Sequence, residues 1–286
     1  MKRRLVLIVI GATVLAFGRM QVWAMPQSPI RQTAAELQQL VAPIALYPDE
    51  LVAQILAAST YPTQVVEADF WLQQHQNLQG EELAAAVNQQ RWDASVKAVT
   101  AFPSVVTNMD QNLLWATALG QAYVNQQQNV LDAVQVMRRR AQDAGNLQST
   151  REQRVSIQGS AIVIEPVSAD TCYLPVYDPG SVYGAPIEVY PGYIYNPWYG
   201  GPYVVFGPAV GLGFFGRFGW GWPAWGFNWD RHVVVFNRTP FISRNEVFVR
   251  EGAAFRGFAP GFRSFGGNRT FRTFRSGGFR AFAHHR

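Results

Sequence analysis

The chain has 286 residues, a formal net charge of +5 and a single cysteine. One cysteine excludes an intramolecular disulfide, so the folded part must be held together by an apolar core. The net charge alone says little about binding partners, because the charged residues are distributed unevenly along the chain.

Residues 1–24 have the pattern of a cleaved secretion signal. Lys2, Arg3 and Arg4 precede an apolar run, and "VWA" at 22–24 has the small residues that a signal peptidase reads. The apolar run is shorter than the roughly 20 residues of a membrane-spanning helix, and no cysteine follows it to carry a lipid. We therefore expect export, and a mature chain without a transmembrane span.

Residues 30–150 predict an acidic α-helical domain. Segments such as "AAELQQLVAPIAL", "PTQVVEADFWLQQH" and "NVLDAVQVMRRRAQDAG" are rich in Ala, Leu, Gln and Val, and Pro, Gly, Asp or Asn bound them. Val130, Val134, Met137 and Ala141 fall on one helical face. About 120 residues of this kind can bury one core, which indicates a helical bundle or a short helical solenoid.

Aromatic-proline pairs mark three of the expected helix starts. They are Tyr47-Pro48, Tyr61-Pro62 and Phe102-Pro103. Proline suits the first helical position because it has no amide hydrogen to leave unpaired. Asp49 and Glu50 then fall in a first turn, where negative charge is favourable. We interpret both acids as structural and expect Asp49→Ala to lower the melting temperature only mildly.

Other groups that could carry chemistry are also interpreted as structural. Arg138, Arg139 and Arg140 end the last helix and are expected to be solvated, with an anion-binding patch as the alternative. His75 does not share a helical face with its neighbouring acids, and Cys172 lies in an apolar run that predicts a buried thiol. No catalytic motif is found, so the sequence predicts neither an enzyme nor a cofactor or metal site.

Residues 151–184 predict a small antiparallel β unit. Val155 and Ile157 alternate with polar residues, and "AIVIE" and "TCYLPVY" are runs of β-branched or aromatic residues. Two or three strands are marginally stable alone, so we expect this unit to pack on the helices.

Residues 185–230 form a segment rich in Gly, Pro, Trp and Tyr. Residues 190–229 hold 15 aromatic residues, with little aliphatic material for a core. "GLGFFG" at 211–216 matches the dinucleotide-binding pattern, but no helix is expected after it, so we interpret the match as chance. The segment predicts either an irregular loop or sugar stacking or membrane-interface contact. The candidate stacking residues are Tyr193, Tyr195, Trp198 and Tyr199.

The end of the chain is basic. Residues 231–251 predict a hairpin with its turn at 238–240, and residues 252–286 are a tail with repeated Phe-Arg pairs that we expect to be disordered. Residues 25–148 hold 6 bases and 11 acids, whereas residues 206–286 hold 12 and 3. Guanidinium groups suit phosphates, although a solubilising tail without a fixed partner is the alternative. The candidate anion-binding residues are Arg256, Arg263, Arg269, Arg272, Arg275 and Arg280.

Several segments in fixed order resemble a known family. "LVAPIALYPDELVAQILAASTYPTQVVEADFW", then "WDASVKAVTAFPSVV" and "IVIEPVSADTCYLPVYDPGSVYG", are similar to the bacterial domain of unknown function 3300 over roughly residues 35–185. The resemblance implies an exported protein of a Gram-negative bacterium, located in the periplasm or cell envelope. It implies no activity, cofactor or catalytic residue.

The sequence thus predicts a mainly α protein with a small antiparallel β appendage and a low-complexity, partly disordered C-terminal third. We expect a non-catalytic envelope interaction or scaffold protein whose tail contacts lipid headgroups, lipopolysaccharide or other envelope proteins. Export argues against nucleic acid as the partner. The alternatives are a glycan-binding module that uses the four stacking residues, and an envelope hydrolase whose carboxylates are brought together only by the fold.

Overall fold

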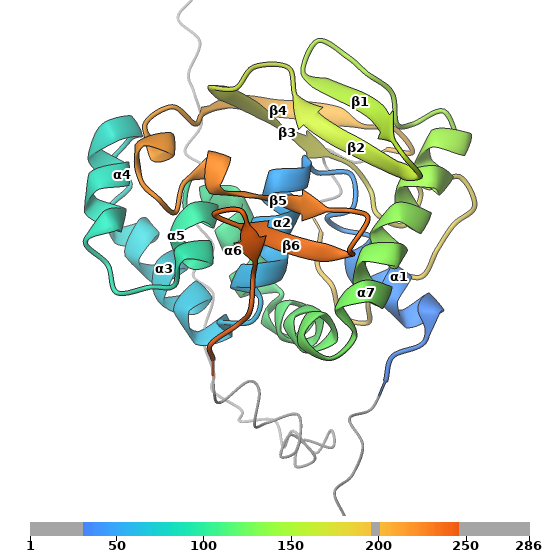
Figure 1. Ribbon diagram of the computed structural model, residues 1–286, viewed down its shortest axis with the longest axis horizontal. Helices are drawn as coiled ribbons and strands as arrows, with labels where there is room; N and C mark the ends of the chain where they lie inside the picture. Colours follow the sequence, from blue (N-terminus) through green and yellow to red (C-terminus); the bar gives the residue numbers. More distant parts are fainter. Residues whose placement is uncertain (1–30, 196–200, 246–286) are drawn as a thin grey trace, which may run out of the picture. The chain divides into compact units, whose positions relative to one another are not determined.

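The computed structural model describes residues 31–195 and 201–245. Within these ranges, seven α-helices precede a set of short strands (Figure 1). The helices are α1 (Ala34–Val41), α2 (Asp49–Ala58), α3 (Pro62–Gln74), α4 (Gly80–Asn88), α5 (Ala94–Val99), α6 (Pro103–Gln111) and α7 (Leu113–Asp143). In the described part of the chain, no helix is long and apolar enough to cross a membrane.

The aromatic-proline pairs lie at helix starts, as predicted. Pro62 and Pro103 occupy the first turns of α3 and α6, while Pro48 is the residue just before α2. α1 begins with a capping box, in which the Thr33 hydroxyl accepts from the Glu36 amide and the Glu36 carboxylate accepts from the Thr33 amide. Local sequence signals therefore set several of the helix boundaries.

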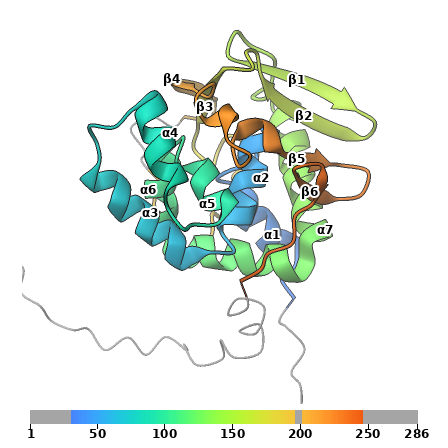
Figure 2. The same ribbon diagram turned by 60° about the vertical axis from the view of Figure 1, so that its left-hand side comes forward.

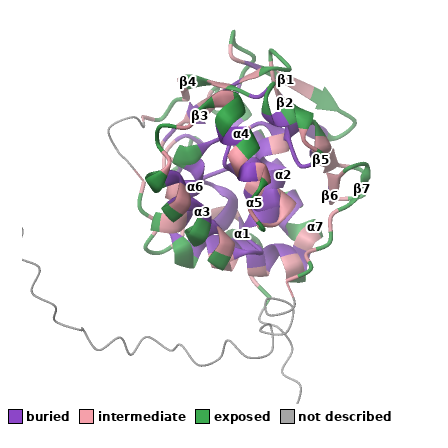
Figure 3. Cartoon of the chain, turned by 90° about the vertical axis from the view of Figure 1, so that its left-hand side faces the viewer, coloured by how far each residue is buried: buried purple, intermediate pink, exposed green. Residues whose placement is uncertain are grey.

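Helix α2 is the centre of the core. Its sequence, "DELVAQILAA", is apolar after the first turn except at Gln54, and every residue from 51 to 58 is buried. It contacts α5, α7, β2 and β5, and Figures 1 and 2 show it enclosed by these elements. Buried residues gather on α2 and on the sides of the other helices that face it (Figure 3).

A glycine allows α7 to approach the end of α2. A Cβ atom at Gly120 would lie 2.1 Å from the backbone oxygen of Ser59, which is far inside van der Waals contact. A side chain at position 120 would therefore require either α7 or the end of α2 to shift.

α7 also departs from helical geometry at Gln126, where φ is −143°. The Gln126 side chain there bonds both the amide and the carbonyl of Gln32.

The strands form three small antiparallel sheets. β1 (Gln153–Gln158) pairs with β2 (Ala161–Pro166) through a turn at Gly159, whose φ is +60°. β3 (Thr171–Val176) pairs with β4 (Val205–Gly211), and β5 (Trp225–Asn228), β6 (Val233–Phe236) and β7 (Thr239–Pro240) form the third sheet. The prediction of a helical protein with small antiparallel sheets is confirmed.

The aromatic segment differs from the irregular loop that was one of its two predictions. It supplies β4, β5 and two 3-10 helices, η2 (Phe215–Arg217) and η3 (Trp222–Ala224). Trp220, Trp222 and Trp225 are buried, and the Trp222 ring lies 5.7 Å from the ring of Phe102. Large indole rings supply the apolar area that aliphatic residues would otherwise provide, so this segment is part of the core.

The predicted hairpin is present in part and is shifted. β6 pairs with β5 before it, as well as with the two residues of β7. The turn between β6 and β7 lies at Asn237 and Arg238, whose φ angles are +48° and +66°, rather than at 238–240. Asparagine adopts this left-handed conformation more readily than most residues, which explains the earlier turn.

Candidate functional site

A buried arginine at the centre of the fold forms hydrogen bonds to several segments of the chain. The Arg138 side chain is fully buried, and its Nη1 donates to Asp49 Oδ1 at 2.6 Å and to the Ile162 carbonyl at 2.8 Å. Its Nε donates to the Ala45 carbonyl at 2.8 Å and its Nη2 to the Tyr47 carbonyl at 3.1 Å. The guanidinium is therefore bonded on each of its nitrogens, as a buried cation requires.

This position corrects the prediction of a solvated helix end. α7 continues to Asp143, so Arg138 lies more than one turn before the end, on the same face as Val134. Arg139 is exposed and Arg140 is partly exposed, so only these two follow the prediction. Arg138 is structural because four of its five N–H donors are used within the fold.

Asp49 is the partner of this arginine and has more contacts than a helix-dipole role requires. Its Oδ1 also accepts from the Ile164 amide at 3.2 Å, and its Oδ2 accepts from the Trp229 indole at 2.8 Å. The Trp229 ring lies 5.5 Å from the guanidinium carbon of Arg138. One carboxylate thus connects α2 with α7, β2 and the segment after β5.

Glu50 lies beside this ion pair in the chain, and one of its carboxyl oxygens has no hydrogen-bond partner among the described residues. That atom, Oε2, is buried. Burial raises the pKa of Glu50 to about 7, and the negative charges of Asp49 and Glu165 add to the rise. The two adjacent acids therefore differ in environment, because Asp49 has an ion-pair partner and hydrogen-bond donors whereas burial disfavours the charged form of Glu50.

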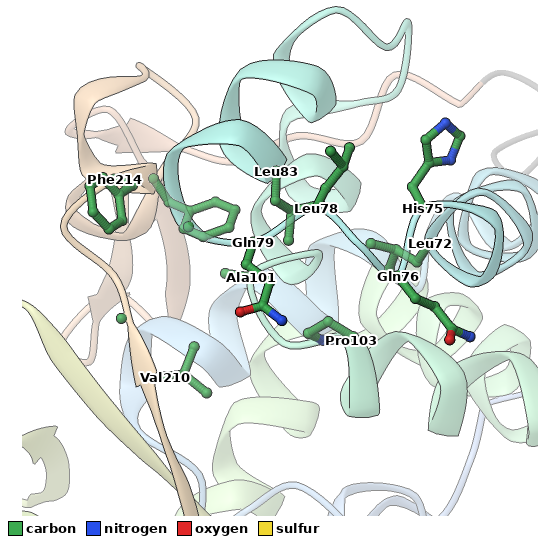
Figure 4. A pocket seen from close by; sticks show the side chains of 13 residues that line it. Leu72, His75, Gln76, Leu78, Gln79, Leu83, Ala101, Pro103, Val210 and Phe214 are labelled. Carbon is green, nitrogen blue, oxygen red and sulfur yellow. The ribbon is translucent and has the colours of Figure 1, made fainter.

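A largely apolar pocket lies between the helices and the segment that contains β4. Its volume is about 380 Å³, and Figure 4 shows its walls. One wall comes from the end of α3, the start of α4 and the connection between them, and the other from β4 and η2. The lining residues are Leu72, His75, Gln76, Leu78, Gln79, Gly80, Leu83, Ala101, Pro103, Val210, Gly211, Phe214 and Phe215.

Two glycines shape this pocket. Gly80 begins α4 with a φ of +51°, and a Cβ there would lie 3.3 Å from the Phe214 ring. A Cβ at Gly211 would meet nothing within 4 Å. Gly80 therefore allows Phe214 to pack against the start of α4. Gly211 has no side chain, so the space beside β4 stays open.

His75 forms part of the pocket wall in a fixed orientation. Its ring stacks on Trp71 with a centroid separation of 4.1 Å, and Nδ1 lies 2.8 Å from the Trp71 carbonyl. Because a carbonyl can only accept, Nδ1 is the donor in this contact. Among the described residues, no group of three His, Cys, Asp or Glu side chains could hold a metal ion.

An exposed ion pair lies beside the pocket. Arg217 Nη1 is 2.8 Å from Glu81 Oε1, and the Arg217 guanidinium carbon is 5.7 Å from the centre of the Phe214 ring. Both charged side chains are more than half exposed. This pair adds one positive and one negative charge near Phe214, so it gives that side of the pocket no net charge.

The candidate stacking residues are only partly described. The Tyr193 hydroxyl donates to Asn108 Oδ1 at 2.9 Å, and its ring meets Trp115 edge-on at 5.1 Å. Trp198 and Tyr199 lie outside the described residues. A separate pocket of about 130 Å³ has four tyrosines among its ten lining residues, Tyr47, Tyr177, Tyr193 and Tyr195.

Of the other residues that the sequence analysis singled out, some are described by the structure and others lie outside the described residues. Cys172 is buried as predicted, and burial raises its pKa to about 12, so the thiolate is suppressed. The signal segment 1–24, the six candidate anion-binding arginines and the tail 252–286 all lie outside the described residues. The pocket was not predicted from the sequence, although "GLGFFG" supplies three of its lining residues.

The comparisons agree with the resemblance seen in the sequence. Residues 33–254 match the family described as "Protein of unknown function (DUF3300)", which extends through the aromatic segment. The chain is 38% identical over 184 residues to "Uncharacterized protein YacH" of Escherichia coli (strain K12), a match that covers 53% of this chain and 30% of that protein. The match thus spans less than a third of the relative's length. No solved structure matches the chain. The chain belongs to the DUF3300 family of proteins of unknown function.

Proposed function

We propose that this is a non-catalytic interaction protein of the cell envelope whose basic C-terminal tail binds anionic envelope components. The observation that carries the proposal is the separation of charge between the described fold and the tail. Residues 31–245 contain 17 acids and 12 bases, whereas residues 246–286 contain two acids and eight arginines. A fold that is acidic in sum repels anionic surfaces, while the tail attracts them.

The chemistry of the tail supports phosphates as its target. Arginine binds phosphate through two parallel hydrogen bonds, and the phenylalanine beside most of these arginines adds apolar contact at a lipid surface. Lipid headgroups and lipopolysaccharide both present phosphates.

Vesicle binding tests the proposal. The mature chain, residues 25–286, is sedimented with phosphatidylcholine vesicles that contain or lack phosphatidylglycerol, and separately with lipopolysaccharide. We expect binding to the anionic targets alone, weakening as the salt concentration rises. A variant with the six tail arginines replaced by glutamine should lose binding to the anionic targets. The matched variant with lysine at these positions should keep most of that binding. Binding that is absent, or that salt does not change, would overturn the proposal.

Export is tested separately. We expect the protein recovered from the periplasmic fraction of its host to begin at Met25, as the small residues at 22–24 predict. Recovery of an uncleaved chain in the cytoplasmic fraction would contradict the envelope location. This result would leave anion binding by the tail open to the vesicle measurement.

Glycan binding is the second candidate, because four tyrosines meet at the smaller pocket. Sugar rings stack on aromatic faces, and Tyr195 is only partly buried. This candidate predicts retention on peptidoglycan that survives high salt and that Tyr195→Ala reduces. The control is Tyr203→Ala, which removes an exposed tyrosine outside this pocket.

A further inference from the structure

The larger pocket has the lining of a site for a hydrocarbon chain. Eight of its residues have apolar side chains, and its polar members, His75, Gln76 and Gln79, carry no acid, lysine or arginine charge. A ligand body that enters it therefore gains by leaving water and finds no charge to pair with. This composition favours an uncharged apolar group.

The size of the pocket limits the ligand to one chain. Its volume of about 380 Å³ compares with the roughly 150 Å³ of an apolar cavity that holds benzene, so it has room for about a dozen carbon atoms. It also lies within the range of natural small-molecule pockets, roughly 300–1,000 Å³. Two chains of that length would exceed its volume.

The polar groups lie on one side of the pocket. Figure 4 shows His75, Gln76 and Gln79 coming from the end of α3 and its connection to α4, while Val210 and Phe214 lie across the space on the β4 side. Amide groups both donate and accept hydrogen bonds, so they suit a polar head group. The arrangement therefore matches an amphiphile whose chain lies against the apolar wall.

The apolar wall is fixed but incompletely covered. Phe214 packs against Gly80, yet 40% of its surface remains exposed. The open space beside Gly211 lies on the same wall. A chain placed there would cover both, and its cost of ordering is reduced because the wall is already formed.

We propose that this pocket binds a single-chain amphiphile, such as a fatty acid or a lysophospholipid, with its hydrocarbon chain between α4 and β4. A phenylalanine of the chain's own tail is the competing occupant. Five of the eight phenylalanines in residues 252–286 precede an arginine, and no lining residue is acidic. Glu81, the acid in the ion pair beside Phe214, is already paired with Arg217. The charges therefore favour the amphiphile.

Calorimetric titration of the delipidated mature chain tests the proposal. Laurate and lauroyl lysophosphatidylcholine share a chain and differ in head group, so they distinguish a fatty acid from a phospholipid source. Affinity for the saturated series from hexanoate to myristate should rise about fourfold per methylene and then level off when the pocket is full. A rise that never levels off would indicate non-specific association and would overturn the proposal.

Two leucine substitutions place the binding at this pocket. Gly211→Leu puts a side chain into the open space on β4 and should weaken laurate binding at least tenfold. Gly226→Leu is the matched control, because Gly226 also lies in a strand with nothing within 4 Å of its Cβ position but does not line the pocket. Equal effects of the two substitutions, or no laurate binding by the unsubstituted protein, would overturn the proposal.

A third variant tests the competing occupant. Serine replaces all eight phenylalanines of the tail, Phe255, Phe258, Phe262, Phe265, Phe271, Phe274, Phe279 and Phe282. If the pocket is free for an amphiphile, laurate affinity stays within twofold of the unsubstituted protein. A severalfold gain in affinity would show that the tail occupies the pocket and would replace the proposal.

Discussion

Arg138 and Asp49, which are 89 residues apart in sequence, form a buried ion pair with an Nη1–Oδ1 distance of 2.6 Å. Each group also bonds to polar groups of the fold, so neither charge depends on water. Such a pair is expensive to break from one side, because the remaining charge is left buried without compensation. The pair therefore connects α2 and α7 more firmly than a surface ion pair could.

Asp49→Ala is expected to lower the free energy of unfolding by about 3–5 kcal/mol, which is more than the mild effect predicted from its helix position. Urea unfolding followed by tryptophan fluorescence measures it. Glu81→Ala is the control, since Glu81 belongs to an exposed ion pair and should have little effect. Similar small losses in the two variants would contradict the role of the buried pair.

Glu50 is expected to make stability depend on pH. Its pKa of about 7 in the folded protein exceeds the ordinary value of 4.5, so the folded state binds the proton more tightly. The stabilisation is fully present below about pH 4.5 and is lost as the pH rises through about 7. Glu50→Gln should flatten this profile and raise the free energy of unfolding at pH 8 by about 2–4 kcal/mol.

Urea denaturation across this pH range measures the profile. Glu67→Gln serves as control, because Glu67 is an exposed glutamate on α3. If Glu50→Gln retains the slope of the unsubstituted protein between pH 5 and pH 7, groups other than Glu50 are responsible for it.

Gly120→Ala is expected to destabilise the fold strongly. The new Cβ would lie 2.1 Å from the Ser59 carbonyl oxygen, so α7 must move away from the end of α2. Overpacking of this kind costs about 1–3 kcal/mol and sometimes more. Thermal unfolding measures the loss. Gly219→Ala, where nothing lies within 4 Å of the Cβ position, should stay within about 0.5 kcal/mol, and comparable losses would refute the close approach.

Trp222→Ala tests whether the aromatic segment belongs to the core. Its side chain is buried against Phe102, so truncation should cost about 3–5 kcal/mol in a urea unfolding experiment. Tyr203→Ala, at a residue that is 57% exposed, provides the comparison within the same segment. An unchanged unfolding midpoint for Trp222→Ala would mean that helices and small sheets are stable without this segment.

The helices could be predicted well because their signals are local. Proline at helix starts, the Thr33 capping box and the apolar face of α7 each act within a few residues. The apolar face of α7 also indicates that Arg138 is buried. Arg138 lies four residues after Val134 and three before Ala141, so helical spacing places it among buried residues.

The pocket and the role of the aromatic segment could not be predicted in this way. The pocket lies between Leu83 of α4 and Val210 of β4, which are far apart in the sequence. No sequence pattern indicates that these two residues come close together in space. A pattern of Gly, Pro and Trp is equally typical of a loop and of an irregular core layer. Only the packing of Trp222 on Phe102 distinguishes the two.

The bond between Asp49 and Trp229 also bears on the order in which the chain folds. These residues are 180 positions apart, and synthesis delivers Asp49 long before Trp229. Until that indole arrives, the carboxylate lacks one of its donors, and α2 lacks the strand β5 that covers it. Contacts of such long range slow folding, so we expect the helices to assemble first and the native centre to close only after nearly the whole fold has been made.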